Sequence, residues 1–143
     1  MSQVSRFVLQ AFSAICLAFW LVLLLREVEP STKKAILSFG WGAPYICALF
    51  IRSELLVGTA AGTSLGGIAT ATVFLFAQFL GAGRQETARV LEMLLLSNLL
   101  LFSCSVAIWF RNRAFLKSDR TVLSTIVASA YMGVIFVLYD LAK

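Results

Sequence analysis

The chain has 143 residues, of which 60% are hydrophobic and 13% are charged, and its mean hydropathy is +0.91. Soluble domains carry about 25% charged residues and about 45–50% apolar residues, so this composition excludes an ordinary soluble domain. The net charge of +5 would favour nucleic acid in a soluble protein, but in a membrane protein it is typical of basic loops that contact anionic lipid head groups. We therefore expect membrane lipids, and no nucleic acid, among the partners.

The charged residues are distributed so that five long segments contain no Asp, Glu, Lys or Arg. These segments are 7–25, 35–51, 55–83, 93–110 and 121–139. A helix needs about 20 apolar residues, with a range of about 17–25, to cross a hydrocarbon layer of about 30 Å. The sequence therefore predicts an all-α fold, a polytopic transmembrane helix bundle with five membrane helices, in which residues 1–143 form a single domain.

The first two predicted helices differ in regularity. Segment 7–25 is too long for the apolar core of a secretory signal and is followed directly by charged residues, which favours a retained helix. Segment 35–51 is short and contains Gly40, Gly42 and Pro44. Interrupted backbone is tolerated in a membrane only where protein or water covers it. Segment 35–51 is therefore predicted to be a fifth crossing, with a re-entrant segment beside four crossings as the alternative.

The third predicted helix, 55–81, contains the strongest local pattern in the sequence. Glycines recur at every fourth residue on one face, and threonines follow a face of their own. Small residues at this spacing let helix backbones approach closely, whereas hydroxyl groups can also line a hydrated path. We interpret this face as a packing surface, with a pore lining as the alternative. The candidate residues are Gly58, Thr59, Gly62, Thr63, Gly66 and Thr70.

Three side-chain amides, Gln10, Gln78 and Asn98, lie within the apolar segments. Each needs a hydrogen-bond partner in hydrocarbon, and interhelical bonds of this kind contribute about 0.5–2 kcal/mol. Asn98, in the fourth predicted helix 90–110, lies nearest to the middle of the membrane. We interpret these amides as contacts between helices, with contact to a substrate as the alternative for Asn98.

The carboxylates nearest to the membrane interior are those of Glu92 and Asp140. Acids inside a membrane are usually functional because charge there is unfavourable, but Arg89 lies one helical turn from Glu92, so we predict paired surface charges. The most basic segment, 111–120, precedes the fifth predicted helix, 121–141. We expect its basic surface to face the cytoplasm and to contact anionic head groups or an acidic partner. That surface comprises Arg111, Arg113, Lys117 and Arg120.

The distribution of Lys and Arg does not fix the number of crossings. With five crossings, six basic residues lie on each side; with four, eight lie on one side and four on the other. An excess of basic residues is typical of cytoplasmic loops, so charge favours four crossings while segment length favours five. Segment 111–120 is cytoplasmic in both arrangements, and we expect a multi-pass protein of a bacterial inner membrane.

The residues that commonly carry chemistry are scarce. The chain has no histidine, which excludes His-based proton relays and Ser-His or Cys-His nucleophilic pairs. Its three cysteines lie far apart in apolar segments, without the spacing of metal ligands. We predict no catalytic, cofactor-binding or metal-binding residue, and no enzyme activity.

The expected function is therefore non-catalytic. The sequence favours a small multispanning protein that acts through helix–helix contacts as a subunit, an assembly factor or a partner-binding factor, with a protein partner or a homo-oligomer. One alternative is a homo-oligomeric channel or small-solute transporter lined by the Gly/Thr-rich helix 58–72. A second alternative is a lipid-modifying membrane enzyme, which would act at the membrane surface.

Overall fold

The computed structural model describes residues 3–27, 32–51, 55–77, 79–80, 85–111 and 119–141. All regular structure in these residues is helical, which confirms the predicted all-α fold. The five helices are α1 (Gln3–Glu27), α2 (Thr32–Phe50), α3 (Leu55–Ala77), α4 (Gln85–Arg111) and α6 (Asp119–Leu141). Helices α1 and α4 begin several residues before their charge-free segments, because long charged side chains are good helix formers and can extend toward the membrane surface.

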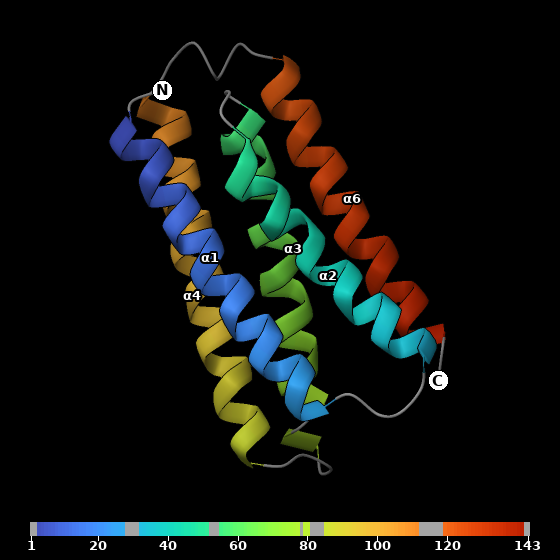
Figure 1. Cartoon of the computed structure of the whole chain (residues 1–143). Helices are drawn as coiled ribbons and strands as arrows, with labels where there is room; N and C mark the ends of the chain where they lie inside the picture. The colour runs from blue at the N-terminus through green and yellow to red at the C-terminus, as the bar shows by residue number, and fades with distance from the viewer. Residues whose placement is uncertain are drawn as a thin grey trace.

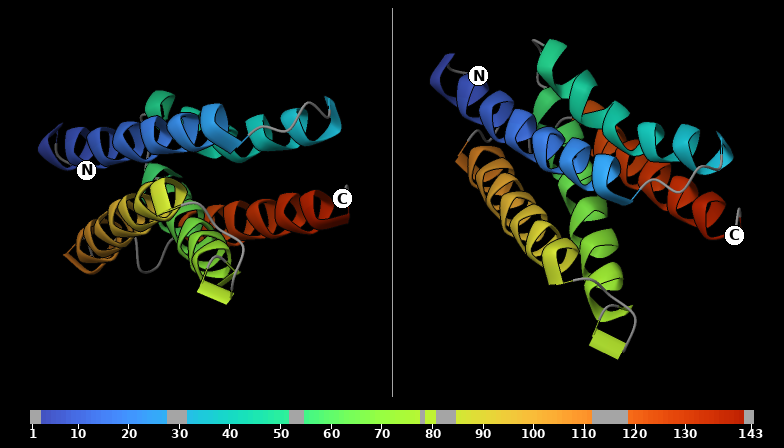
Figure 2. Two further views of the ribbon diagram at one scale, coloured as in Figure 1. Left: turned by 90° about the horizontal axis from the view of Figure 1, so that it is seen from below. Right: turned by 60° about the horizontal axis from the view of Figure 1, so that its bottom comes forward.

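The helices form two layers. Helices α1 and α2 lie side by side across one face of a second layer, which consists of α4, α3 and α6 in that spatial order (Figure 2). Successive helices run in opposite directions, so the two termini lie at opposite ends of the bundle (Figure 1). Helix α3 is central, since it packs extensively against both α4 and α6.

The composition of α3 explains its central position. Its buried residues are mainly Gly, Ala, Ser and Thr, and they surround most of the helix axis. Because small side chains let neighbouring backbones approach from several directions, α3 accommodates α4 on one side and α6 on the other. No other membrane-length helix in the described part of the chain is buried to the same extent.

Four of the helices are long and apolar enough to cross a membrane. These spans are Gln3–Leu23, Leu55–Ala77, Ala88–Arg111 and Asp119–Leu138. Helix α2 is not among them, so the predicted number of five membrane helices is not established by length and apolarity. The α2 helix is nevertheless continuous through Pro44. It extends alongside α1 and does not turn back on itself as a re-entrant segment would (Figure 1).

Exposed apolar side chains define the part of the bundle that fits a bilayer. Phe110 is 66% exposed and lies 12 residues beyond Asn98, about 18 Å along α4 at about 1.5 Å per residue. In the other direction Phe76 is 63% exposed and lies nine residues beyond Gly67, about 14 Å along α3. Gly67 is next to Asn98. A hydrocarbon layer of about 30 Å therefore places Asn98 near its middle.

Candidate functional site

The predicted glycine face of α3 lies against α6. A Cβ atom at Gly58 would collide with the backbone oxygen of Thr121, and one at Gly62 would collide with the backbone oxygen of Thr125. At Gly62 the same Cβ would also lie 2.9 Å from the Cβ of Ala128. Backbone meets backbone here, so neither helix can move aside by a side-chain rotation. The absence of side chains at these two glycines allows the close approach.

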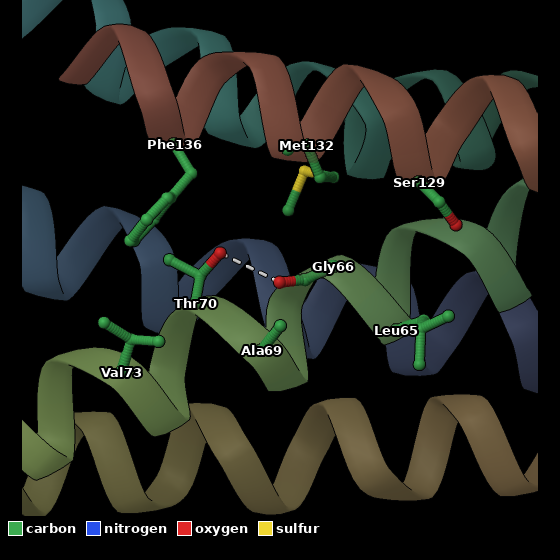
Figure 3. Close-up of a pocket in the computed structure, with 9 residues that line it drawn as sticks. Leu65, Gly66, Ala69, Thr70, Val73, Ser129, Met132 and Phe136 are labelled. Atoms are coloured by element: carbon green, nitrogen blue, oxygen red, sulfur yellow. Dashed lines mark hydrogen bonds between the residues drawn. The ribbon is translucent and has the colours of Figure 1, made fainter. Parts of the chain in front are cut away.

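Beyond this crossing the two helices diverge (Figure 1). An apolar groove lies between them (Figure 3). We call this feature the α3–α6 groove. Met132 and Phe136 of α6 extend toward α3 and fill part of the space (Figure 3). A cavity of about 280 Å³ remains. Its lining residues are Leu65, Gly66, Ala69, Thr70, Val73, Ser129, Met132, Gly133 and Phe136.

Gly133, in the wall of the α3–α6 groove, differs from the other glycines that the structure describes. A Cβ at Gly133 would have no neighbour within 4 Å, whereas a Cβ at each of the other described glycines would meet an atom within 3.1 Å. Glycine in the middle of a helix is less favourable than alanine by about 0.8–1.0 kcal/mol. No contact in the described part of the chain requires glycine at this position and so explains the lower helix stability. Gly133 leaves open space on the surface of the bundle.

The three candidate threonines of α3, Thr59, Thr63 and Thr70, do not lie along one open path. Thr63 is buried, and its hydroxyl has no hydrogen-bond partner among the described residues. Thr70 reaches the α3–α6 groove, but its hydroxyl donates to the Gly66 carbonyl oxygen at 2.8 Å. Thr59 is half-buried. One of the three therefore lines the groove, and its donor is already used by the backbone.

A buried polar cluster lies on the other side of α3. The hydroxyl of Tyr45 in α2 donates to Oδ1 of Asn98 in α4 at 2.6 Å, and both residues are fully buried. The Asn98 amide donates in turn to the Leu94 carbonyl oxygen at 2.8 Å. Gly67 of α3 provides the space, because a Cβ there would collide with both polar groups. Three helices thus meet at one hydrogen bond near mid-membrane.

Gln10 has a different role from Asn98. Its side-chain amide donates to the carbonyl oxygens of Leu49 and Ile51, at 3.1 Å and 3.4 Å. The last carbonyl groups of a helix have no partner within that helix, and in a membrane water does not replace it. Gln10 of α1 therefore satisfies the C-terminal end of α2. The third predicted amide, Gln78, lies outside the described residues.

The proline of α2 creates a second carbonyl group that needs a donor. Pro44 has no N–H, so the carbonyl of Gly40, four residues earlier, lacks its partner within the helix. The hydroxyl of Tyr131 in α6 donates to this oxygen at 2.7 Å. Helix α2 therefore accepts hydrogen bonds from α1 and α6 and donates one to α4, at three different levels along its length.

Aromatic rings connect α1 to the wall of the α3–α6 groove. Trp20 of α1 stacks on Trp41 of α2, with ring centroids 5.2 Å apart. Trp41 meets the edge of Phe74 at 5.7 Å, and Phe74 contacts Phe136 at 6.0 Å. Aromatic pairs at these separations contribute about 0.5–1.5 kcal/mol beyond the area they bury. The row of rings joins α1, α2, α3 and α6.

The charged residues correct one prediction. Glu92 and Arg89 are both exposed, and no ion pair joins them in the described part of the chain, so the expected pairing of these two charges is wrong. Arg111 and Arg120 are exposed near the ends of α4 and α6. The other members of the predicted basic surface, Arg113 and Lys117, lie outside the described residues, as does the side chain of Asp140.

Sequence reasoning missed the partners of several polar groups. Tyr45, Tyr131 and Gly67 were not among the candidates, although Pro44 predicts that the Gly40 carbonyl needs a donor. The spacing from Gly40 to Pro44 could have identified the acceptor, but no local pattern identifies Tyr131 as the donor, 91 residues away.

The described residues contain no group of three His, Cys, Asp or Glu side chains placed to hold a metal ion. Comparison of the chain with protein-family models, with curated proteins and with solved structures finds no match. A functional assignment therefore depends on the geometry of the groove, of the buried polar cluster and of the exposed helix faces.

Proposed function

We propose that this chain is a non-catalytic multispanning membrane protein that binds a transmembrane helix of another protein in the α3–α6 groove. The observation that carries the proposal is Gly133, an exposed glycine for which the described residues offer no packing reason. Small residues on a membrane helix allow a second backbone to approach closely. Gly133 and Ala69 lie on opposite walls of the groove, on α6 and α3, and suit such an approach.

A helix fits this groove better than a lipid chain does. A fluid acyl chain adapts to the shape of the surface that it covers, so it gains little from the absence of one methyl group. A helix is rigid, and its dispersion contacts increase when its backbone can come closer. The open space at Gly133 is therefore most useful to a rigid partner.

We also propose that α2 is a fifth crossing of the membrane. Tyr45, five residues before α2 ends at Phe50, bonds Asn98 directly, so α2 reaches the level of Asn98. The carbonyl oxygens of Leu49 and Ile51 accept hydrogen bonds from Gln10 of α1, so the C-terminal end of α2 is held against a membrane-spanning helix. Five crossings agree with termini at opposite ends of the bundle. We further propose that the basic segment 111–120 faces the cytoplasm of a bacterial inner membrane, close to anionic head groups.

The two alternative functions have less support. A channel lined by residues 58–72 would need hydroxyl groups along an open path, yet Thr63 is buried between helices. A lipid-modifying enzyme would need a cluster of reactive side chains at the membrane surface, and the part of the chain described here offers none with three metal-ligating groups. Helix–helix binding requires only the packing surface that α3 and α6 present.

The test is site-specific photocross-linking in native membranes. A photoreactive amino acid is placed at Leu65 or Val73, which line the groove, and at Val127, which is 57% exposed on α6 but is not among the groove residues. We expect the two groove positions to cross-link to a membrane segment of another protein. The control at Val127 should give lipid adducts only.

The matched variants are Gly133→Leu and Val134→Leu. A Cβ at Gly133 meets no atom within 4 Å and the side chain would extend into the groove, so folding should persist while the groove is blocked. Val134 is exposed and does not line the groove, so its replacement should leave the cross-link intact. Lipid adducts at Leu65 and Val73, or a protein cross-link that survives Gly133→Leu, would contradict the proposal. A cross-link to a second copy of this chain would replace the partner protein with a homo-oligomer.

A further inference from the structure

A carboxylate lies on the outer face of α4 at membrane depth. Glu92 is exposed and lies six residues before Asn98, which is about 9 Å along the helix from the mid-membrane level. Half of the hydrocarbon layer measures about 15 Å. The attachment point of the Glu92 side chain is therefore inside the apolar layer, on a face that no other described helix covers.

The surroundings of Glu92 are apolar. Met93, Leu96 and Leu99 are 52%, 54% and 43% exposed, so the neighbouring surface of α4 is made for contact with hydrocarbon. Arg89 is the nearest cation along the helix, but no ion pair joins it to Glu92 in the described residues. The order of the two residues is also the less favourable one, because an acid stabilises a helix pair best when it precedes the base.

A charge at this depth needs compensation. Ionisable side chains in membrane segments are rare, and they almost always pair with another charge or face a hydrated cavity. Glu92 does neither within the described part of the chain. We infer that the outer face of α4 binds a partner transmembrane helix that carries a Lys or Arg at the depth of Glu92.

Charge complementarity selects this partner over the other possible occupants. A zwitterionic or anionic head group lies at the surface, above the depth of the Glu92 attachment point, and an anionic group would also be repelled. A second copy of this chain would bring another Glu92 to the same face, if it docked through that face by twofold symmetry. A basic helix supplies the opposite charge, and Met93, Leu96 and Leu99 exclude water from the contact on the side toward mid-membrane.

This inference shares with the proposed function only the premise that the chain binds membrane helices. Helices α4 and α6 lie on opposite sides of α3 (Figure 2). The face around Glu92 is therefore separate from the α3–α6 groove. A failure of the groove cross-links leaves the α4 face untested, and a failure at Glu92 leaves the groove intact.

The experiment uses the full chain in phosphatidylcholine vesicles, with energy transfer from labelled transmembrane peptides as the readout. Each peptide is a leucine-rich helix of about 21 residues. The first carries one Lys about 9 Å from its centre, the second carries Glu at that position, and the third has no charge. We expect the Lys peptide to bind at least about tenfold more tightly than the other two. Glu92→Gln should abolish this difference.

Two further variants make each outcome decisive. Leu99→Ile, on the same exposed face, should retain binding of the Lys peptide. Equal binding of the three peptides to the unaltered chain would overturn the inference, and so would unchanged Lys-peptide binding by Glu92→Gln. If the Lys peptide binds Arg89→Gln but not the unaltered chain, Arg89 neutralises Glu92 internally and the inference is also wrong.

Discussion

Gly62→Ala tests the contact between α3 and α6 with a single methyl group. The added Cβ would collide with the Thr125 carbonyl oxygen and would lie 2.9 Å from the Cβ of Ala128. Both neighbours are rigid, one being backbone and the other a Cβ fixed to it. The methyl group can therefore be accommodated only if the two helices move apart, which loosens the contacts on either side of Gly62.

The expected magnitude follows from two opposing effects. Overpacking a well-packed interior costs about 1–3 kcal/mol, and a clash with backbone belongs at the upper end of that range. Replacement of glycine by alanine within a helix stabilises the helix by about 1 kcal/mol, which offsets part of this cost. We therefore expect Gly62→Ala to lower the free energy of unfolding by about 2 kcal/mol. Gly133→Ala is the matched control, since its methyl group meets no atom within 4 Å; it should raise the free energy by about 1 kcal/mol.

The assay is reversible unfolding in lipid bicelles or mixed micelles, followed by intrinsic tryptophan fluorescence. The quantity to compare is the free energy of unfolding of the two alanine variants, which should differ by about 3 kcal/mol. Free energies of unfolding that agree within about 0.5 kcal/mol, a typical limit for surface substitutions, would refute the reasoning. In that case α3 and α6 would not be in backbone contact at Gly62.

Three further outcomes are expected. Tyr131→Phe should lower the free energy of unfolding by about 1 kcal/mol because it removes the donor to the Gly40 carbonyl, and Pro44→Ala in the same chain should restore the loss by supplying a backbone N–H. Tyr45→Phe and Asn98→Leu should show a coupling energy of about 0.5–1.5 kcal/mol in a double-mutant cycle, whereas additive effects would mean that the two side chains do not interact. Reporters fused to the two ends of the chain should lie on opposite sides of the membrane, and signals from one side would exclude five crossings.

Some features of this protein are accessible from sequence because they depend on composition over a long window. Charge-free segments of sufficient length predict membrane helices, since each charged residue in hydrocarbon is unfavourable. The same physics predicts the ends of the helices less closely, since α4 begins at Gln85, eight residues before its charge-free segment. The spacing of Gly58, Gly62 and Gly66 likewise marks one helix face as a packing surface, although it names no partner for that face.

The identity of each contact was decided only by the tertiary structure. Gly58 and Gly62 lie against α6, whereas Gly67, one residue beyond the predicted face, makes room for the bond between Tyr45 and Asn98. Gly133 belongs to no local pattern, and its open surroundings became apparent only from the positions of α3 and α6. A helix period tells which side chains share a face, but the partner of that face depends on contacts between residues far apart in the chain.

Polar groups illustrate the same division. The sequence alone determines that Gln10 and Asn98 need partners and that Pro44 leaves a carbonyl group free, because hydrocarbon offers no hydrogen bonds. The tertiary structure determines that these needs are met by the end of α2, by Tyr45 and by Tyr131. It also leaves Glu92 without an ion-pair partner in the described residues. A requirement for a partner is local to one residue, whereas the partner is set by how the whole bundle packs.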